Sequence, residues 1–150
     1  MSILFLTFLA ACLAAAATGS IFRPGEWYDG LTKPDWNPPK WAFPVVWTIL
    51  YLLSAVAATR VALVPGSGQA IAFWSLQIAL NTLWTPVVFG AHRLGAGVVV
   101  IAALWLTLVA VAGSFLSYDL WAGLLIVPYL LWVSLAAALN FWLWRNNPSD

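Results

Sequence analysis

Aromatic, amide and small side chains recur at helical spacing in three long apolar stretches of this 150-residue chain. Residues separated by four, seven and eleven positions lie on one face of a helix, so each set would form a stripe. The stripes are Trp47, Tyr51, Ser54 and Ala58; Gln77, Asn81, Trp84 and Val88; and Trp132, Ala136, Leu139 and Asn140. Because none of these side chains is charged, the chemistry they offer is ring stacking and hydrogen bonding.

Two interpretations fit these stripes. In the first, tryptophans fill the interior of a helical bundle and the amides form hydrogen bonds between helices. In the second, the rings and a few polar anchors line a pocket for a flat apolar ligand. The amide of Asn81 would face the protein in both cases, since exposure to lipid without a partner costs several kcal/mol. The spacing alone does not decide between packing and a pocket.

No carboxylate lies inside the predicted apolar stretches. The carboxylates are Glu26, Asp29, Asp35, Asp119 and Asp150, and the single histidine, at the end of a stretch, is His92. This placement weighs against a proton-coupled pump, general acid–base catalysis, a nucleophile–base pair and histidine-ligated haem. The single cysteine, Cys12, cannot form an internal disulfide or a zinc site of several thiolates. No metal site is therefore predicted.

The composition places these stripes in a membrane protein. The chain is 63% hydrophobic and 7% charged, whereas a soluble domain carries about 25% charged residues. A spanning helix needs about 20 mainly apolar residues. A signal peptide requires basic residues near its start, and no Lys or Arg precedes Arg23. We therefore interpret the first stretch as a retained helix. We therefore predict an all-α fold, a single domain with five transmembrane helices in a bundle. The predicted helices cover 2–22, 44–64, 69–91, 94–115 and 120–144, with a long loop at 23–43.

The distribution of basic residues predicts an orientation. With five spans, the two termini lie on opposite sides of the membrane. The side with the first loop and the C-terminus carries Arg23, Lys33, Lys40, Arg93 and Arg145, and the other side carries Arg60. The positive-inside rule then predicts an outside N-terminus and a cytoplasmic first loop and C-terminus. In a bacterium the membrane would be the inner one. The basic residues form no cluster, so lipid rather than nucleic acid is the expected partner.

Prolines and tryptophans crowd the segment WNPPKWAFPVVWTILY, residues 36–51. Proline fixes its own φ and keeps the preceding residue out of the helical region, so Pro38 and Pro39 predict a stiff, extended approach. Pro44 suits the first turn of the following helix, where a missing N–H costs nothing. The prolines therefore set where the helix starts, and Trp47 follows about one turn inside it.

The same segment resembles the signature W-x-P-P-x-W-x-F-P-x-x-W-x-x-x-Y of the TspO/MBR family. That family includes translocator proteins, tryptophan-rich sensory proteins and the peripheral-type benzodiazepine receptor. The segments KPDWNPP, NTLWTPVVFG and VPYLLWVSLAAALNFWLWRNNP resemble further motifs of the family. The resemblance covers essentially the whole chain and favours the pocket interpretation of the stripes.

The resemblance implies a five-helix bundle, usually a homodimer, with a pocket beneath the first loop. Such proteins bind porphyrins and related tetrapyrroles, sterols in animal members, and synthetic benzodiazepine-site ligands. A porphyrin such as protoporphyrin IX or haem would be a ligand, with no covalent cofactor. Carried over by motif position, the pocket residues would be Trp47, Tyr51, Asn81, Trp84, Trp132, Ala136 and Leu139. The residues covering the pocket would be Trp36, Pro38, Pro39, Phe43 and Pro44.

The function that the resemblance implies is that of a membrane receptor or sensor for tetrapyrroles. One alternative is light- and oxygen-dependent porphyrin degradation, for which Trp47 and Trp132 would be the redox candidates, since no acid–base group is available. Another is passive translocation of a tetrapyrrole or sterol, since the spans hold no residue for ion coupling. The cholesterol motif of animal members departs here, with Phe141 replacing tyrosine between Leu139 and Arg145. We therefore do not predict tight cholesterol binding.

Overall fold

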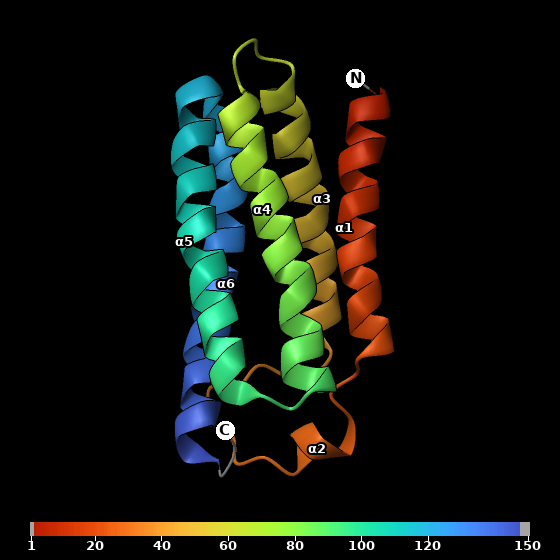
Figure 1. Ribbon diagram of the computed structural model, residues 1–150, viewed down its shortest axis with the longest axis vertical. Coiled ribbons are helices and arrows are strands. Elements are labelled where there is room, and N and C mark those ends of the chain that lie inside the picture. The colour runs from red at the N-terminus through yellow and green to blue at the C-terminus, as the bar shows by residue number, and fades with distance from the viewer. Residues whose placement is uncertain (1, 148–150) are drawn as a thin grey trace.

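A computed structural model describes residues 2–147 and shows a bundle of long helices (Figure 1). Among these residues, five helices are long and apolar enough to cross a membrane, and there is no strand. The predicted all-α, five-helix fold is therefore confirmed. The long helices are α1 (Ser2–Ile21), α3 (Ala42–Ala62), α4 (Gly68–Thr85), α5 (Leu94–Tyr118) and α6 (Leu120–Asn146). The first loop contains the short helix α2 (Gly25–Asp29), and a π-helical turn, η1 (Pro86–Gly90), extends α4.

The helix limits follow the proline chemistry of the sequence. α3 begins at Ala42 rather than at the predicted residue 44, and Pro44 occupies its first turn as predicted. The α-helical pattern of α4 ends before Pro86, which has no N–H to donate to the preceding turn. The backbone widens there into η1, where the N–H of Ala91 donates to the carbonyl of Pro86 at 2.8 Å. A π turn of this kind often marks a functional site.

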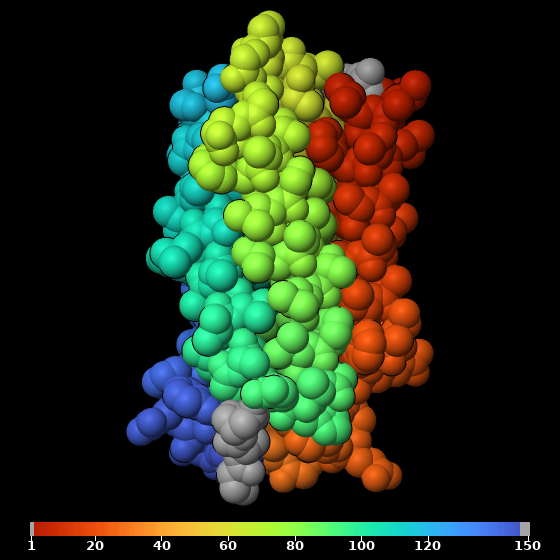
Figure 2. Space-filling model, viewed as in Figure 1, coloured from red at the N-terminus to blue at the C-terminus, as the bar shows by residue number. Residues whose placement is uncertain are grey.

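The five long helices close a ring around a buried core. α1 packs against α3 and α4, α4 packs against α5, α5 against α6, and α6 against α3. Figure 2 shows α4 seated between α1 and α5 on one face of the molecule. Small buried side chains such as Cys12, Ala15 and Ala58 let neighbouring backbones approach closely.

An ion pair joins α3 to α6 at the end of the bundle that carries the N-terminus. Arg60 Nε donates to Asp119 Oδ2 at 2.9 Å, and Arg60 Nη2 donates to Oδ1 at 3.3 Å. Asp119 also caps α6, because its Oδ1 accepts from the backbone N–H groups of Trp121 and Ala122. The hydrogen bonds from Arg60 hold the pKa of Asp119 below its usual range, since they favour the charged carboxylate.

The two ends of the bundle differ in charge. The first loop with α2, the turn after η1 and the end of α6 lie at one end, here called the loop end, and the N-terminus lies at the other (Figure 1). The basic residues in the loop-end segments are Arg23, Lys33, Lys40, Arg93 and Arg145, whereas Arg60 lies at the N-terminal end. The folded chain therefore has the charge asymmetry used above for orientation. Which end faces the cytoplasm stays a prediction.

Candidate ligand site at the loop end

Five rings from α3 and α6 meet inside the bundle and form what we call the aromatic cluster: Phe43, Trp47, Tyr51, Tyr129 and Trp132. Trp47 stacks on Tyr51, with ring centroids 5.5 Å apart and planes inclined by 28°. Trp47 also makes T-shaped contacts, with ring centroids 5.8 Å apart to Tyr129 and 6.5 Å apart to Trp132. Phe43 meets Trp132 edge to face at 5.6 Å. The helical spacing of Trp47, Tyr51 and Trp132 thus does place their rings together.

A chain of hydrogen bonds runs through the aromatic cluster and ties α3, α4 and α6 together. The hydroxyl of Tyr51 donates to Asn81 Oδ1 at 3.0 Å, and Asn81 Nδ2 donates to the hydroxyl of Tyr129 at 2.6 Å. That hydroxyl donates to Gln77 Oε1 at 2.7 Å. Each of the four side chains is at most 7% exposed. Polar groups in the apolar interior are satisfied in this way, which stabilises the bundle and fixes the rings.

Two buried donors in the described part of the chain have no partner within the protein: Gln77 Nε2 and Trp132 Nε1. Both belong to residues at or beside the aromatic cluster. A buried N–H without an acceptor costs about 1–3 kcal/mol. The indole of Trp132 therefore offers a hydrogen bond to an acceptor brought by a ligand or by water.

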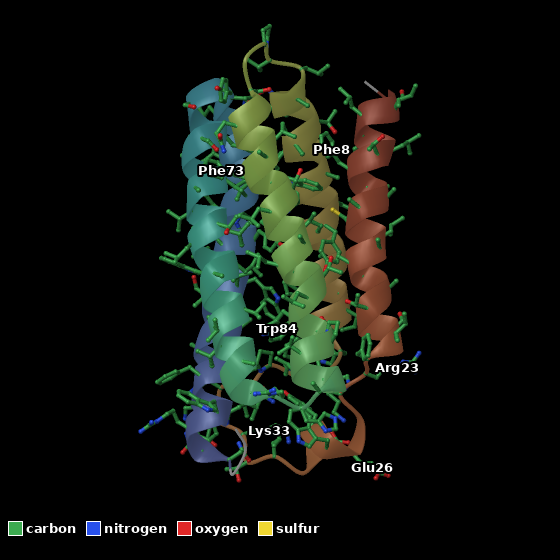
Figure 3. The ribbon with its side chains drawn as sticks, viewed as in Figure 1. Phe8, Arg23, Glu26, Lys33, Phe73 and Trp84 are labelled. Carbon is green, nitrogen blue, oxygen red and sulfur yellow. The ribbon has the colours of Figure 1, made fainter. Side chains whose placement is uncertain are left out.

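A second amide joins α4, α5 and α6 nearer the loop end. Trp84 Nε1 donates to Asn140 Oδ1 at 2.9 Å, and Asn140 Nδ2 donates to the carbonyl of Leu94 at 2.9 Å. Gly97 makes room for this arrangement, because a Cβ there would lie 2.7 Å from Asn140 Oδ1 and would also collide with Val88. Figure 3 shows Trp84 between the helices close to the loop end.

A small cavity lies between these helices and the first loop. Its volume is about 20 Å³, which is room for about one water molecule. Phe89 of η1 lies in its wall and makes edge-to-face contacts, with its ring centroid 5.7 Å from that of Trp84, 5.8 Å from that of Tyr28 and 6.5 Å from that of Trp27. The lining residues are Trp27, Tyr28, Leu31, Phe43, Trp84, Val88, Phe89, Leu94, Ala136, Leu139, Asn140 and Leu143. Ligand pockets usually have volumes of about 300–1,000 Å³, so this structure holds the site closed.

The first loop, residues 22–41, covers this cavity and is called the lid below. Tyr28 donates its hydroxyl to Asn37 Oδ1 at 3.1 Å, and Lys33 Nζ lies 5.0 Å from the centre of the Tyr28 ring. Lys33 also donates to the carbonyls of Asp29 and Leu31, both at 3.1 Å, and Lys40 forms an ion pair with Asp29. Burial raises the pKa of Tyr28 above its usual value. The lid is therefore a folded unit with internal contacts.

The predicted pocket residues divide between the cavity and the aromatic cluster. Those that line the cavity are Trp84, Ala136 and Leu139. Trp47, Tyr51 and Trp132 lie in the aromatic cluster, and Asn81 lies in its hydrogen-bond chain. The two parts are contiguous, because Phe43 lines the cavity and touches Trp132.

Of the predicted covering residues, one lies against the cavity and four do not. Phe43 lines it, whereas Trp36 is 46% exposed, Pro38 is half-buried, and Pro39 and Pro44 are exposed. The lid residues that do line the cavity come from its first half, and they are Trp27, Tyr28 and Leu31. Apolar residues amid the polar loop sequence GEWYDGLTKPD were the available signal for them.

An open groove runs along the outside of the bundle between α3 and α6. Its volume is about 420 Å³, and its lining residues are Val46, Ile49, Leu50, Leu53, Pro128, Leu131, Trp132 and Leu135. Trp132 belongs both to this groove and to the aromatic cluster. The groove is apolar and lies within the spanning segments α3 and α6.

Known proteins are similar to this chain over nearly its whole length. The sequence profile described as the TspO/MBR family matches residues 8–145. The chain belongs to the TspO/MBR family. The resemblance of the tryptophan–proline motifs is thus confirmed, and with five apolar helices the chain is a multi-pass membrane protein.

TspO/MBR relatives from bacteria and from animals are similar along most of this chain. The "Tryptophan-rich sensory protein" of Cereibacter sphaeroides is 54% identical over 144 residues, which is 96% of this chain and 91% of the relative. "Protein CrtK" of Rhodobacter capsulatus is 49% identical and covers 98% of this chain and 94% of its own length. The human "Translocator protein" is 32% identical, with 86% and 81% covered.

The motif that animal TspO/MBR proteins are proposed to use for cholesterol does not form one surface here. Leu139 is buried and lines the cavity, whereas Phe141 is 51% exposed and packs against Trp144 on the outside. Arg145 lies over the ring of the same Trp144. Positions two apart in a helix point to nearly opposite sides, so Leu139 and Phe141 cannot contact one flat ligand together.

Proposed function

We propose that this TspO/MBR protein is a membrane receptor for porphyrins and related tetrapyrroles, which bind between the lid and the aromatic cluster. The observation that carries the proposal is the contiguity of the cavity and the cluster. Phe43 belongs to both, and Ala136, one helical turn beyond Trp132, lines the cavity. A flat macrocycle could lie against these rings, because aromatic faces favour stacked and edge contacts.

The charge distribution suits a ligand with an apolar ring and carboxylate substituents. The described residues that line the cavity and the cluster are uncharged. Figure 3 shows Lys33 at the loop end, and its Nζ lies 5.0 Å from the ring of Tyr28, which lines the cavity. A porphyrin with its propionates toward the loop end would therefore place its negative charge near this ammonium group and keep its ring in the apolar interior.

Binding requires the site to open. The cavity holds about 20 Å³, whereas a ligand of this class needs several hundred Å³. The lid is the part of the wall that no transmembrane helix provides, so its movement is the simplest way to enlarge the site. We expect association to be slower than diffusion, because only the open form admits the ligand.

Titration with protoporphyrin IX tests the proposal. The full chain in lipid nanodiscs should show saturable quenching of its tryptophan fluorescence. Trp132→Ala should weaken binding by about ten-fold through loss of a ring contact, and Asn81→Ala should weaken it by loosening Tyr51. Trp121→Ala is the matched control, because Trp121 is 64% exposed and lies at the other end of α6. Thermal unfolding should confirm that each variant is folded.

The proposal fails if protoporphyrin does not saturate the wild-type protein. It also fails if Trp132→Ala and Asn81→Ala bind as tightly as Trp121→Ala does. In either case the aromatic cluster would only fill the interior of the bundle and would not bind a ligand.

The contact between Trp47 and Trp132 favours a second candidate, light- and oxygen-dependent breakdown of the bound porphyrin. The two rings meet at 6.5 Å beside the proposed ligand, so a tryptophan oxidised by the excited porphyrin could exchange an electron with its neighbour. Dioxygen would be the oxidant that opens the macrocycle. Illumination of the complex should then produce a bilin-like absorbance that Trp47→Phe and Trp132→Phe abolish. Full rates in both variants would exclude a role for these residues.

We also propose the cytoplasm of a bacterial cell as the compartment that faces the loop end. The loop-end segments carry five basic residues against one at the other end, and cytoplasmic loops carry the excess of such residues. A membrane-impermeant thiol reagent applied to intact spheroplasts should label Gly68→Cys at the exposed start of α4 and spare Trp36→Cys in the lid. The reverse pattern would invert the orientation.

A further inference from the structure

The lid is attached to the bundle by its two ends and by contacts along its length. Its ends continue into α1 and α3, which pack against each other. From these two roots the lid crosses the loop end of the bundle toward the end of α6, as Figure 1 shows. What holds the far part of the lid therefore decides whether it can swing away from the cavity.

Asn147, directly after α6, forms hydrogen bonds with Thr32 in the part of the lid that lies near the end of α6. The backbone N–H of Thr32 donates to Asn147 Oδ1 at 2.8 Å, and Asn147 Nδ2 donates to the carbonyl of Thr32 at 3.0 Å. The same Nδ2 donates to the carbonyl of Leu143 at 2.9 Å. The Asn147 amide thus pairs with the backbone N–H and the backbone carbonyl of Thr32, and the carbonyl of Leu143 in α6 orients it. Leu143 itself lines the cavity.

Ring contacts complete the closed arrangement. Trp27 stacks on His92 of the turn after η1, with centroids 4.3 Å apart and planes inclined by 5°. Trp27 and Tyr28 also meet the edge of Phe89. Stacked rings can slide, whereas the paired hydrogen bonds at Thr32 fix one register. The amide of Asn147 is for this reason the contact that defines the closed position.

We propose that Asn147 is a latch that holds the lid closed over the cavity and sets the rate at which ligand enters and leaves. Its role in ligand exchange rests on the proposed function, but its role in lid closure does not. Because the latch acts on the lid whether or not ligand lies beneath, it changes both exchange rates and leaves the affinity nearly constant.

Asn147→Asp is the sharpest perturbation, since it replaces one NH₂ group by an oxygen of similar size. The carboxylate keeps the acceptor for the N–H of Thr32 but turns an acceptor toward the carbonyls of Thr32 and Leu143. It also adds negative charge at the C-terminal end of α6, where the helix dipole disfavours it. Asn146→Asp is the matched control: it adds the same charge one residue earlier, where Nδ2 donates only to the carbonyl of Trp142 within α6.

The lid is tested first without any ligand. Ala136→Cys places a thiol in the cavity wall, in a Cys12→Ser background that removes the native thiol. In nanodiscs, a water-soluble maleimide should label it about ten-fold faster when Asn147→Asp is added, since the loss of one hydrogen bond to the lid and the new repulsion between the carboxylate and the Thr32 carbonyl are together worth about that factor. Asn146→Asp should label at the background rate. Equal rates for the two aspartate variants overturn the latch.

The effect on ligand exchange is tested with protoporphyrin IX in stopped-flow fluorescence. Asn147→Asp should raise the association and dissociation rates by about the same ten-fold factor, with a nearly constant dissociation constant. Unchanged rates overturn the kinetic role of the latch. If the wild-type protein binds no protoporphyrin, the proposed function fails, and the labelling comparison still decides whether Asn147 closes the lid.

Discussion

Gly97 of α5 is the position where the structure leaves least room for a side chain beside the cavity. A Cβ there would lie 2.7 Å from Asn140 Oδ1 and closer still to Val88. Both neighbours line the cavity, and Asn140 holds Trp84 and the carbonyl of Leu94. Gly97→Ala must therefore either move α5 away from α6 or displace this amide.

The expected cost can be worked from these contacts. Overpacking of a filled interior costs about 1–3 kcal/mol, and loss of one buried hydrogen bond adds about 1 kcal/mol. The better helix propensity of alanine offsets at most about 1 kcal/mol. The net loss of unfolding free energy is then about 1–3 kcal/mol. For a chain of this length it lowers the midpoint of thermal unfolding by several degrees, at about 2–4 °C per kcal/mol.

The assay is thermal unfolding in a single detergent, with Gly113→Ala as the matched control. Gly113 lies in the same helix, and a Cβ there would meet nothing within 4 Å. We expect Gly113→Ala to leave the midpoint unchanged or raised, and Gly97→Ala to lower it and to weaken protoporphyrin binding. Equal midpoints for the two variants would refute the close packing of α5 against Asn140 and Val88.

Three predictions concern other parts of the bundle. Ser54→Ala removes the acceptor 2.8 Å from the buried indole N–H of Trp74, and thermal unfolding should show a loss of about 1–3 kcal/mol. The hydrogen bonds from Arg60 lower the pKa of Asp119 below 3.8. The stability that they give to the folded state is therefore complete above pH 3.8 and is lost as pH falls through the folded pKa. Asp119→Asn should remove this acid dependence of the thermal unfolding midpoint. Burial raises the pKa of Tyr28 above 10.0. The stability that the buried neutral phenol gives to the lid is therefore complete below pH 10 and is lost as pH rises through the folded pKa. Hydrogen exchange of the lid should accelerate above pH 10, and less so in Tyr28→Phe.

The sequence was sufficient for the parts of the structure that depend on local pattern. Apolar length located the five spans, and the helical spacing of Trp47 and Tyr51 placed them on the inner face of α3. Tyr129, which joins the hydrogen-bond chain to α6, carried the same signal, because it precedes Trp132 by three residues on one helical face. The predicted stripe on this helix started at Trp132, one helical turn after Tyr129, and therefore left Tyr129 out.

The lid was harder to predict, because its contacts join segments distant in sequence. Trp27 and Tyr28 line the cavity because the first loop packs against Phe89. A loop has no sequence periodicity from which such a contact could be predicted. Asn147 lies in a polar tail, and its partner Thr32 is 115 residues away. The π turn at η1, which places Phe89 in the wall, depends on how the chain relaxes after Pro86.

The central claim is that a porphyrin binds between the lid and the aromatic cluster. A structure of the protoporphyrin IX complex in lipid tests it most directly. We predict a macrocycle in contact with Phe43, Trp132 and Ala136, with Trp27 and Tyr28 moved outward to enlarge the cavity and Thr32 still paired with Asn147. A macrocycle bound in the groove between α3 and α6, or on the outer surface with the cavity still at about 20 Å³, would contradict the claim.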